Sequence, residues 1–557
     1  MIHAPAGRAP GGAEAAARGG VLWGASGRLD AVLGPVALLV LWQILGGMLP
    51  WARYTISSPA AIALRAWHDL AIYPTNVAAT LWEAARGFFW GNLAAIALAL
   101  LIMQVRRLEG LLMQIAIVIY ATPLLAIAPI IAVVLPGDEP KVALAALAVF
   151  FPTVITTLIG LRSADGASLD LIHTLGGRPF DALRKVRLPA SVPWLLAGFR
   201  VAAPGAVLGA ILGEFLGGDR GLGVAMVNAM ATLDTPRVWG LAIVASALAG
   251  GGFALAAAAA RVLVTWAPPL DAAPALTGRA SRGLLPEGGD GGAAGAGRWA
   301  LRRAGLTVVS IGVIVGLWVA FIRVFHLNPF FAKTPVQVLR DLVAGTAAVE
   351  NRRELSAALA MTLEDAAAGF GVGTVTAAFV AVLFVVYPRL ERAFMPVAIT
   401  LRSVPVIAMT PLLVLLFGRG IAGTTAITAI ITFFPTLVNV MQGLRSASPQ
   451  AIEVLRLYAA SPWAVVWKIR IPSALPSVFA AARISVLASI LGAIVAEWLA
   501  TGRGLGYLMI IARAQFQFTM LWAAGILVTI VSVLLYGMLT WVEAPVLRRY
   551  APSQAGR

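Results

Sequence analysis

Long apolar runs alternate with short polar segments along almost the whole chain. Most runs are about 20 residues long, and at about 1.5 Å per residue such a helix crosses the roughly 30 Å apolar layer of a bilayer. Six runs occupy each half. They lie near residues 31–50, 76–103, 108–135, 141–163, 190–216, 238–266, 301–325, 357–386, 391–418, 420–444, 477–500 and 521–546. The pattern predicts an all-α polytopic membrane protein with about twelve transmembrane helices.

A segment without helical periodicity separates the two sets of runs. It covers residues 267–298 and is rich in Gly, Ala and Pro, a composition typical of a flexible linker. Residues 1–30 are rich in Gly, Ala and Arg and lack the apolar core of a signal peptide, so we expect a disordered cytoplasmic tail there. We therefore expect one membrane domain over 31–266 and a second over 299–557.

The two halves are copies of one unit. Residues 150–223 and 433–506 align without a gap at an offset of 283, with 26 identities in 74 positions. Upstream, "TLWEAARGF" at 80–88 matches "TLEDAAAGF" at 362–370. Because six spans are an even number, both copies keep the same orientation. The chain is thus a parallel repeat about an axis along the membrane normal.

Each copy contains one polar island, at 160–193 and at 443–476. The residue pattern of each island predicts two short helices around a bend, polar on one side and apolar on the other. Such a helix pair suits either an interfacial element lying on lipid headgroups or a docking element for a soluble partner. The duplication favours docking, since two equivalent surfaces on a pseudo-two-fold axis match a symmetric dimer.

Prolines punctuate both islands. Pro179 and Pro462 suit the first position of the second short helix, and Ser461 suits the N-cap before Pro462. We expect Pro189 and Pro472 to end each segment, because proline cannot continue the interior of a helix.

Composition narrows the possible chemistry. The chain is 60% hydrophobic, 12% charged and free of cysteine, which excludes disulfides and thiolate metal sites. Its four histidines are scattered, so we expect no metal site and no catalytic constellation. The net charge of +17 is better explained by arginines that orient the spans than by nucleic-acid binding.

The distribution of cations orients the chain. With both termini in the cytoplasm, 25 of the 42 Lys and Arg residues lie on the cytoplasmic side and 13 outside. This bias follows the positive-inside rule and places both islands in the cytoplasm.

The islands resemble the cytoplasmic-loop signature of ABC importer permeases: E-A-A, three residues, G, nine residues, I-x-L-P. The matching positions are Asp170, Gly176, Val186, Leu188 and Pro189 in the first copy, and Glu453, Ala459, Ile469, Ile471 and Pro472 in the second. Both copies depart from the signature: Asp replaces Glu in the first, Ala replaces Gly in the second, and neither keeps the alanine pair. "SPAAIALRAWHDL" before "TLWEAARGFFWG", and "GLGVAM" and "GLGYLM" after the fifth span of each half, look most like the nitrate, sulfonate and taurine branch.

The resemblance implies a function and its partners. It implies two permease units with the type I importer fold, fused in tandem in a bacterial inner membrane. The loops at 170–189 and 453–472, with Pro179 and Pro462, would couple the pore to a cytoplasmic ABC ATPase dimer. An extracytoplasmic solute-binding protein would deliver the solute. None of the four lysines follows a glycine, so the chain has no P-loop; ATP and Mg²⁺ belong to the partner and no cofactor to this chain.

Two spans are interrupted by proline at matching positions, in "YATPLLAIAPI" and "LRSVPVIAMTP". Interrupted helices in corresponding positions of two halves point to a translocation site, although proline kinks are also common in membrane helices. The candidate path residues are Thr122, Pro123, Ser403 and Pro405. Arg402 beside the second break would favour an anionic solute.

Two glutamates and two arginines lie within predicted spans, where a charged side chain is energetically costly. Glu214 and Glu497 are matched at the ends of the fifth and eleventh spans, and Arg200 and Arg483 are matched at their beginnings. Two interpretations remain open: snorkelling of all four side chains to the interfaces, or a gate or inter-half contact at the outer mouth.

A further acid–base pair lies in the second span. Glu83 and Arg86 are three residues apart, so they are placed to satisfy each other on a helix. The matching Asp365 has no basic residue at the equivalent position, Ala368, so we do not expect a device shared by both halves.

The sequence leaves three hypotheses about function, each of a different class. The leading hypothesis is the membrane component of an ATP-driven importer of a small anionic solute. The alternative, an ion-gradient-driven secondary transporter with two six-helix halves, leaves the islands unexplained and expects acidic residues near mid-membrane. A membrane enzyme lacks any supporting metal-ligand or nucleophile motif.

Overall fold

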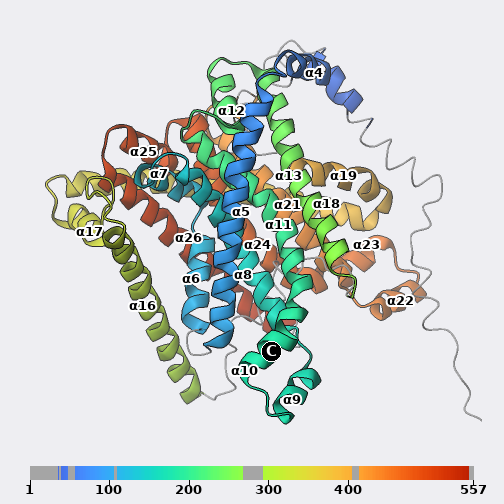
Figure 1. Cartoon of the computed structure of the whole chain (residues 1–557). Coiled ribbons are helices and arrows are strands. Elements are labelled where there is room, and N and C mark those ends of the chain that lie inside the picture. The colour runs from blue at the N-terminus through green and yellow to red at the C-terminus, as the bar shows by residue number, and fades with distance from the viewer. Residues whose placement is uncertain are drawn as a thin grey trace, which may run out of the picture.

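The computed structural model describes residues 36, 39–47, 57–105, 109–266, 293–403, 410, 413–414 and 416–550. Within these ranges the chain is built from helices and turns and contains no strand. Figure 1 shows long, roughly upright helices in the centre with shorter helices at both ends of the bundle.

The described part of the first half contains four long helices and several short ones. Its helices are α4 (Pro59–His68), α5 (Tyr73–Gln104), α6 (Glu109–Ala121), α7 (Leu124–Val134), α8 (Glu139–Arg162), α9 (Gly166–Thr174), α10 (Pro179–Ala182), the π turn η1 (Leu183–Arg187), α11 (Leu188–Phe215), α12 (Leu222–Ala231) and α13 (Thr235–Leu263).

The second half repeats this order. Its helices are α16 (Ala293–Val324), α17 (Pro335–Ala344), α18 (Ala348–Val386), α19 (Pro388–Ser403), α21 (Ile421–Arg445), α22 (Pro449–Leu457), α23 (Pro462–Val465), η2 (Val466–Arg470), α24 (Ile471–Ala496), η3 (Glu497–Thr501), α25 (Gly504–Ala514) and α26 (Phe518–Tyr550).

The architecture confirms the predicted all-α fold. Eight of the described helices are long and apolar enough to cross a membrane. The third predicted span is present as α6 and α7, and the seventh as α16. Of the first span only 39–47 is described, and of the ninth only α19 and scattered positions beyond it. One boundary differs: α16 begins at Ala293, inside the expected linker, of which residues 267–292 lie outside the described ranges.

Small residues let the long helices approach closely in both halves. A Cβ added to Gly87 on α5 would lie 2.3 Å from the Cβ of Ala145, and one added to the matching Gly369 on α18 would lie 2.2 Å from the Cβ of Thr428. Small residues at helix contacts are the usual means of packing in a membrane, where apolar burial alone does not favour association.

The two halves meet along an apolar seam. Leu125, Ala126 and Ile130 of α7 belong to the same buried cluster as Met509 and Leu521 of the second half. Helix α16, the first long helix of the second half, contacts α6 of the first half (Figure 1).

Candidate functional site

The first island folds as two short helices around a bend. Asp165 caps α9 by accepting a hydrogen bond from the backbone N–H of Ser168. Helix α9 then ends at Gly176, whose φ is +74°. The N–H of Gly177 donates to the carbonyl of Ile172 at 2.8 Å, which closes a Schellman turn. Pro179 occupies the first position of α10, as predicted.

The second island has the same architecture. Ser448 and Ser461 cap α22 and α23, and Pro462 follows Ser461 as predicted. The turn after α22 is closed by the N–H of Ala460 donating to Leu455 at 3.0 Å. Ala459 stands where the first island has Gly176 and is held at a φ of +53°. The glycine of the signature is therefore replaced without a change in backbone path.

Large apolar side chains of both islands face outward. In the first island these are Leu171, Leu175 and Phe180, and in the second Val454, Leu457, Tyr458, Trp463 and Trp467. Leu457 is 86% exposed and Leu175 74%. Within the described residues nothing covers these side chains. Exposed clusters of large apolar side chains usually mark a binding surface. The acids at the head of each signature, Asp170 and Glu453, are also exposed.

The expectation that Pro189 and Pro472 end the islands is wrong. Both lie at the start of the following helix, and the chain is one continuous helical element over 179–215 and over 462–499. The π turns explain this: the N–H of Leu188 bonds to the carbonyl of Leu183, five residues back, and Ile471 bonds likewise to Val466. The wider turn makes room for the proline ring, so each island joins its long helix rigidly.

Each island lies at the amino-terminal end of its own long helix, α11 or α24. In Figure 1, α9 and α10 lie at the bottom of the view and α22 and α23 at its right side, whereas α4, α12 and α25 lie toward the upper part.

Glu214 is buried at the opposite end of the bundle, with 1% exposure. Its carboxylate accepts a hydrogen bond from the hydroxyl of Thr80 at 2.6 Å and from the N–H of Gly223 at 2.5 Å. The Thr80 hydroxyl in turn accepts from the N–H of Leu222 at 2.9 Å, and Asn76 accepts from Gly221 at 2.9 Å. The first turn of α12 is therefore fastened to both α5 and α11.

Glu497 repeats this arrangement with 0% exposure. It accepts from the N–H of Gly506 at 2.7 Å, and Thr362 accepts from Leu505 at 2.9 Å. Both glutamates bond within their own half, so snorkelling does not describe them. Their role as a gate stays a prediction.

The pairing expected between Glu83 and Arg86 is wrong. Lys141 donates to Glu83 at 2.9 Å, and Arg86 bonds to Glu139 at 2.7 Å. The matching acid, Asp365, accepts from Thr424 at 2.9 Å and lies 3.5 Å from Arg503. A buried acid beside a cation is thus common to both halves. Sequence reasoning missed it because the cation comes from a different element in each half.

Arg200 and Arg483 lie well inside α11 and α24 rather than at their beginnings. Arg483 is buried and forms an ion pair with Glu543 on α26 at 3.3 Å. Arg200 lies over the ring of Phe253 at 5.3 Å. The interpretation of these arginines as interfacial snorkels is therefore wrong.

The first proline interruption is present as predicted. Helix α6 ends at Ala121 and α7 begins at Leu124, with Thr122 and Pro123 buried between them. The hydroxyl of Thr122 donates to the carbonyl of Val118 at 2.8 Å. At the second interruption Arg402 and Ser403 end α19, and Pro405 lies outside the described residues.

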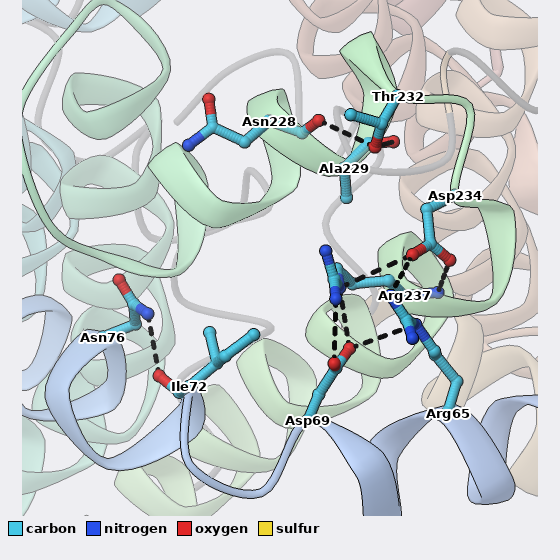
Figure 2. Close-up of polar contacts among 9 residues, drawn as sticks. All are labelled: Arg65, Asp69, Ile72, Asn76, Asn228, Ala229, Thr232, Asp234 and Arg237. Carbon is cyan, nitrogen blue, oxygen red and sulfur yellow. Dashed lines mark hydrogen bonds and ion pairs between the residues drawn. The ribbon is translucent and has the colours of Figure 1, made fainter.

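A network of four charges, absent from the predictions, fastens α4 to α13 at the upper end (Figure 2). Arg237 donates two hydrogen bonds to Asp69, at 2.7 and 2.9 Å, and Arg65 bonds to Asp234 at 2.6 Å. The bonds from Arg237 hold the pKa of the Asp69 carboxyl below its usual range, against the opposing effect of burial. The pair Arg65 and Asp69 lies far from the pair Asp234 and Arg237 in the sequence, and neither is repeated in the second half, so no spacing indicates that the two pairs meet.

The second half uses aromatic rings at the corresponding place. Phe330 and Phe331 pack edge-on against Phe518, and Trp318 stacks on Trp522 with ring centroids 4.9 Å apart. The indole N–H of Trp522 donates to the carbonyl of Phe331 at 2.9 Å. The two halves therefore differ chemically at their upper rims.

Comparison with known proteins agrees with these features. The family model for the binding-protein-dependent transport system inner membrane component matches twice, at residues 91–266 and 369–548. A probable ABC transporter permease of Haemophilus influenzae is 32% identical over 198 residues, 35% of this chain and 81% of that protein.

Two further relatives have named solutes. The formylaminopyrimidine transport permease of Halalkalibacterium halodurans is 30% identical over 34% of this chain and 74% of its own length. The taurine transport permease of Escherichia coli is 28% identical over 42% and 84%. Each of these three matches covers less than half of this chain but about three quarters or more of the relative. The chain belongs to the family of binding-protein-dependent transport system inner membrane components, as two family units fused in tandem.

Proposed function

We propose that this chain is the complete pore of an ABC importer, with both permease units in one polypeptide. A cytoplasmic ATPase dimer binds the two islands and drives alternating access. An extracytoplasmic solute-binding protein delivers the solute at the other end. The observation that supports this most strongly is the pair of matched islands, each with exposed apolar side chains and a rigid helical connection to a long helix.

The rigid connection gives the islands a mechanical role. A force on α10 or α23 is transmitted through η1 or η2 into α11 or α24 without a flexible joint. Each of these long helices ends near a buried glutamate that fastens the next short helix. Movement of an island can thus reach the opposite end of the same half. Residues 170–189 and 453–472 are the proposed coupling loops.

Energy and orientation follow from the same assignment. The chain has no P-loop, so ATP and Mg²⁺ bind the partner ATPase and this chain needs no cofactor. The cation bias supports cytoplasmic islands and termini in a bacterial inner membrane. The proposed domain limits of 31–266 and 299–557 each enclose one family match, at 91–266 and at 369–548. Family membership argues against an ion-gradient-driven mechanism.

For the solute we propose a small anion, on the basis of Arg402 and of the resemblance to sulfonate and taurine permeases. Replacement of Arg402 by Ala should lower anion uptake into proteoliposomes containing the whole transporter. Unchanged uptake would remove Arg402 from the proposal.

The coupling role is tested on exposed side chains, because these can change without disturbing the core. In the variant Leu175→Ser/Phe180→Ser/Leu457→Ser/Trp463→Ser, the amount of co-purified ATPase and the rate of solute uptake should each fall at least tenfold. Val336→Ser/Leu339→Ser on α17 is the control, since these two side chains are exposed, as the island side chains are, but lie outside the islands. If the island variant retained normal ATPase binding and uptake, the assignment would be wrong.

A further inference from the structure

A hydrogen bond crosses the seam between the halves, at the ends of the long helices that lie opposite the islands. Arg513 on α25 donates from Nη1 to the carbonyl of Leu216, the C-cap of α11, at 3.1 Å. The two residues are separated by 297 positions and belong to different permease units. The acceptor is the negative end of a helix, where a guanidinium is well placed.

The bond joins two braced units. Leu216 lies two residues beyond Glu214, which fastens α11 to α12. Arg513 lies on α25, which is fastened to the end of α24 by Glu497. Within the described residues each brace stays inside its own half. The Arg513 bond therefore links the α24–α25 connection of the second half to the α11–α12 connection of the first half.

The bond is partly buried, and the seam next to it is apolar, with Met509 and Ala512 of α25 in the buried cluster. Helix α25 contacts α7, whose Ile130 lies near Gly525 of α26: a Cβ on Gly525 would come within 2.8 Å of the Ile130 side chain. A hydrogen bond from a guanidinium requires a defined donor–acceptor geometry, so it favours one arrangement of these two helix ends. The repeat does not supply a second copy, because the position matching Arg513 in the first half is Met230.

We infer that Arg513 is a positioning residue that holds the outer ends of the two halves together. This rests on the proposed function, since alternating access requires this end to close while the islands' end is open. Opening toward the solute-binding protein must separate α25 from α11 and break the bond. The hydrogen bond between Arg513 and Leu216, here called the latch, therefore raises the free energy of opening in the absence of the loaded binding protein.

The absence of cysteine allows a direct test of opening. Ile130, 7% exposed at the seam, is replaced by Cys as the sole thiol, and its reaction with a membrane-impermeant maleimide is timed in nanodiscs. Adding Arg513→Met, which copies the residue at position 230, should speed labelling about tenfold, which corresponds to roughly 1.4 kcal/mol. Arg513→Lys, which keeps a cationic donor, should label at an intermediate rate.

Two comparisons separate a latch from a general loss of structure. Arg220→Met removes an exposed arginine from the same end and should leave the labelling rate unchanged. In the reconstituted complex, Arg513→Met should raise ATPase activity without binding protein while the thermal unfolding midpoint stays within a few degrees. A purely structural role would lower the midpoint and leave basal ATPase activity low.

Equal labelling rates for the parent and Arg513→Met would overturn the inference. Because the thiol assay needs no ATPase, that result is distinguishable from failure of the proposed function. The proposed function fails instead if no ATPase binds the islands, whatever the labelling rate at Ile130.

Discussion

At the scale of single residues, the two copies solve the same local problem with different side chains. Gly176 and Ala459 both adopt the left-handed conformation that ends a helix. Glycine reaches it freely, whereas a residue with a Cβ is strained by about 1–2 kcal/mol. The sequence motif located this turn, because a signature position and a change of helical periodicity coincide there. It did not reveal that alanine keeps the same backbone path.

The matched turns predict opposite responses. Gly176→Ala should destabilise its turn by about 1 kcal/mol through backbone strain alone, because nothing lies within 4 Å of the added Cβ. Ala459→Gly should relieve strain in the other turn by a similar or smaller amount. Hydrogen exchange of the amides at 177 and 460 measures this: the first variant should exchange faster and the second no faster than the parent. The same direction of change in both would contradict the assigned strain.

The close contact between Gly221 and the buried Glu214 predicts the effect of adding a Cβ at position 221. Gly221 has a φ of +130° and a Cβ there would lie 2.2 Å from the carboxyl carbon of Glu214. Gly221→Ala should therefore lower the thermal unfolding midpoint well beyond the effect of backbone strain. Gly217→Ala is the matched control, because its φ is +140° but nothing lies within 4 Å. Equal midpoints for the two variants would show that the carboxylate does not occupy this space.

At the scale of elements, apolar length identified the spans, but polar side chains fix how they connect. The helices of spanning length and the broken third span were predictable, since periodicity and proline are local signals. The π turns were not predictable, because they depend on how α10 and α11 share one axis. The cations beside Glu83 and Asp365 were equally hidden, since Lys141 and Arg503 come from distant, unmatched positions.

The charged network on α4 gives an element-scale prediction. The pKa of Asp69 is lowered in the folded chain, so its ionised form stabilises the fold above its unfolded pKa of about 3.9 and this contribution is lost as pH falls below about 4. Asp69→Asn should therefore lower the unfolding midpoint at pH 6, and the difference from the parent should shrink at pH 3. Its bidentate partner Arg237 and the neighbouring Arg65, Asp234, His68 and Tyr73 are the other charged or titratable groups there. A difference independent of pH would contradict the ion pairing.

At the scale of the whole molecule, duplication explains the common plan and divergence explains the differences. The islands, the glycine contacts and the buried glutamates are retained in both halves. The upper rims differ, with ion pairs in the first half and aromatic rings in the second. The repeat in the sequence predicted what is shared. It could not predict the seam between halves, because the residues that meet there, such as Ile130 and Gly525, are unrelated by the repeat.

The central claim is that one chain provides both coupling loops for one ATPase dimer. Native mass spectrometry of the purified transporter tests this by counting subunits directly. We expect one copy of this chain with two ATPase subunits, because each island occupies one of them. Two copies of this chain with two ATPase subunits would mean that one island per chain is unused, and would contradict the account.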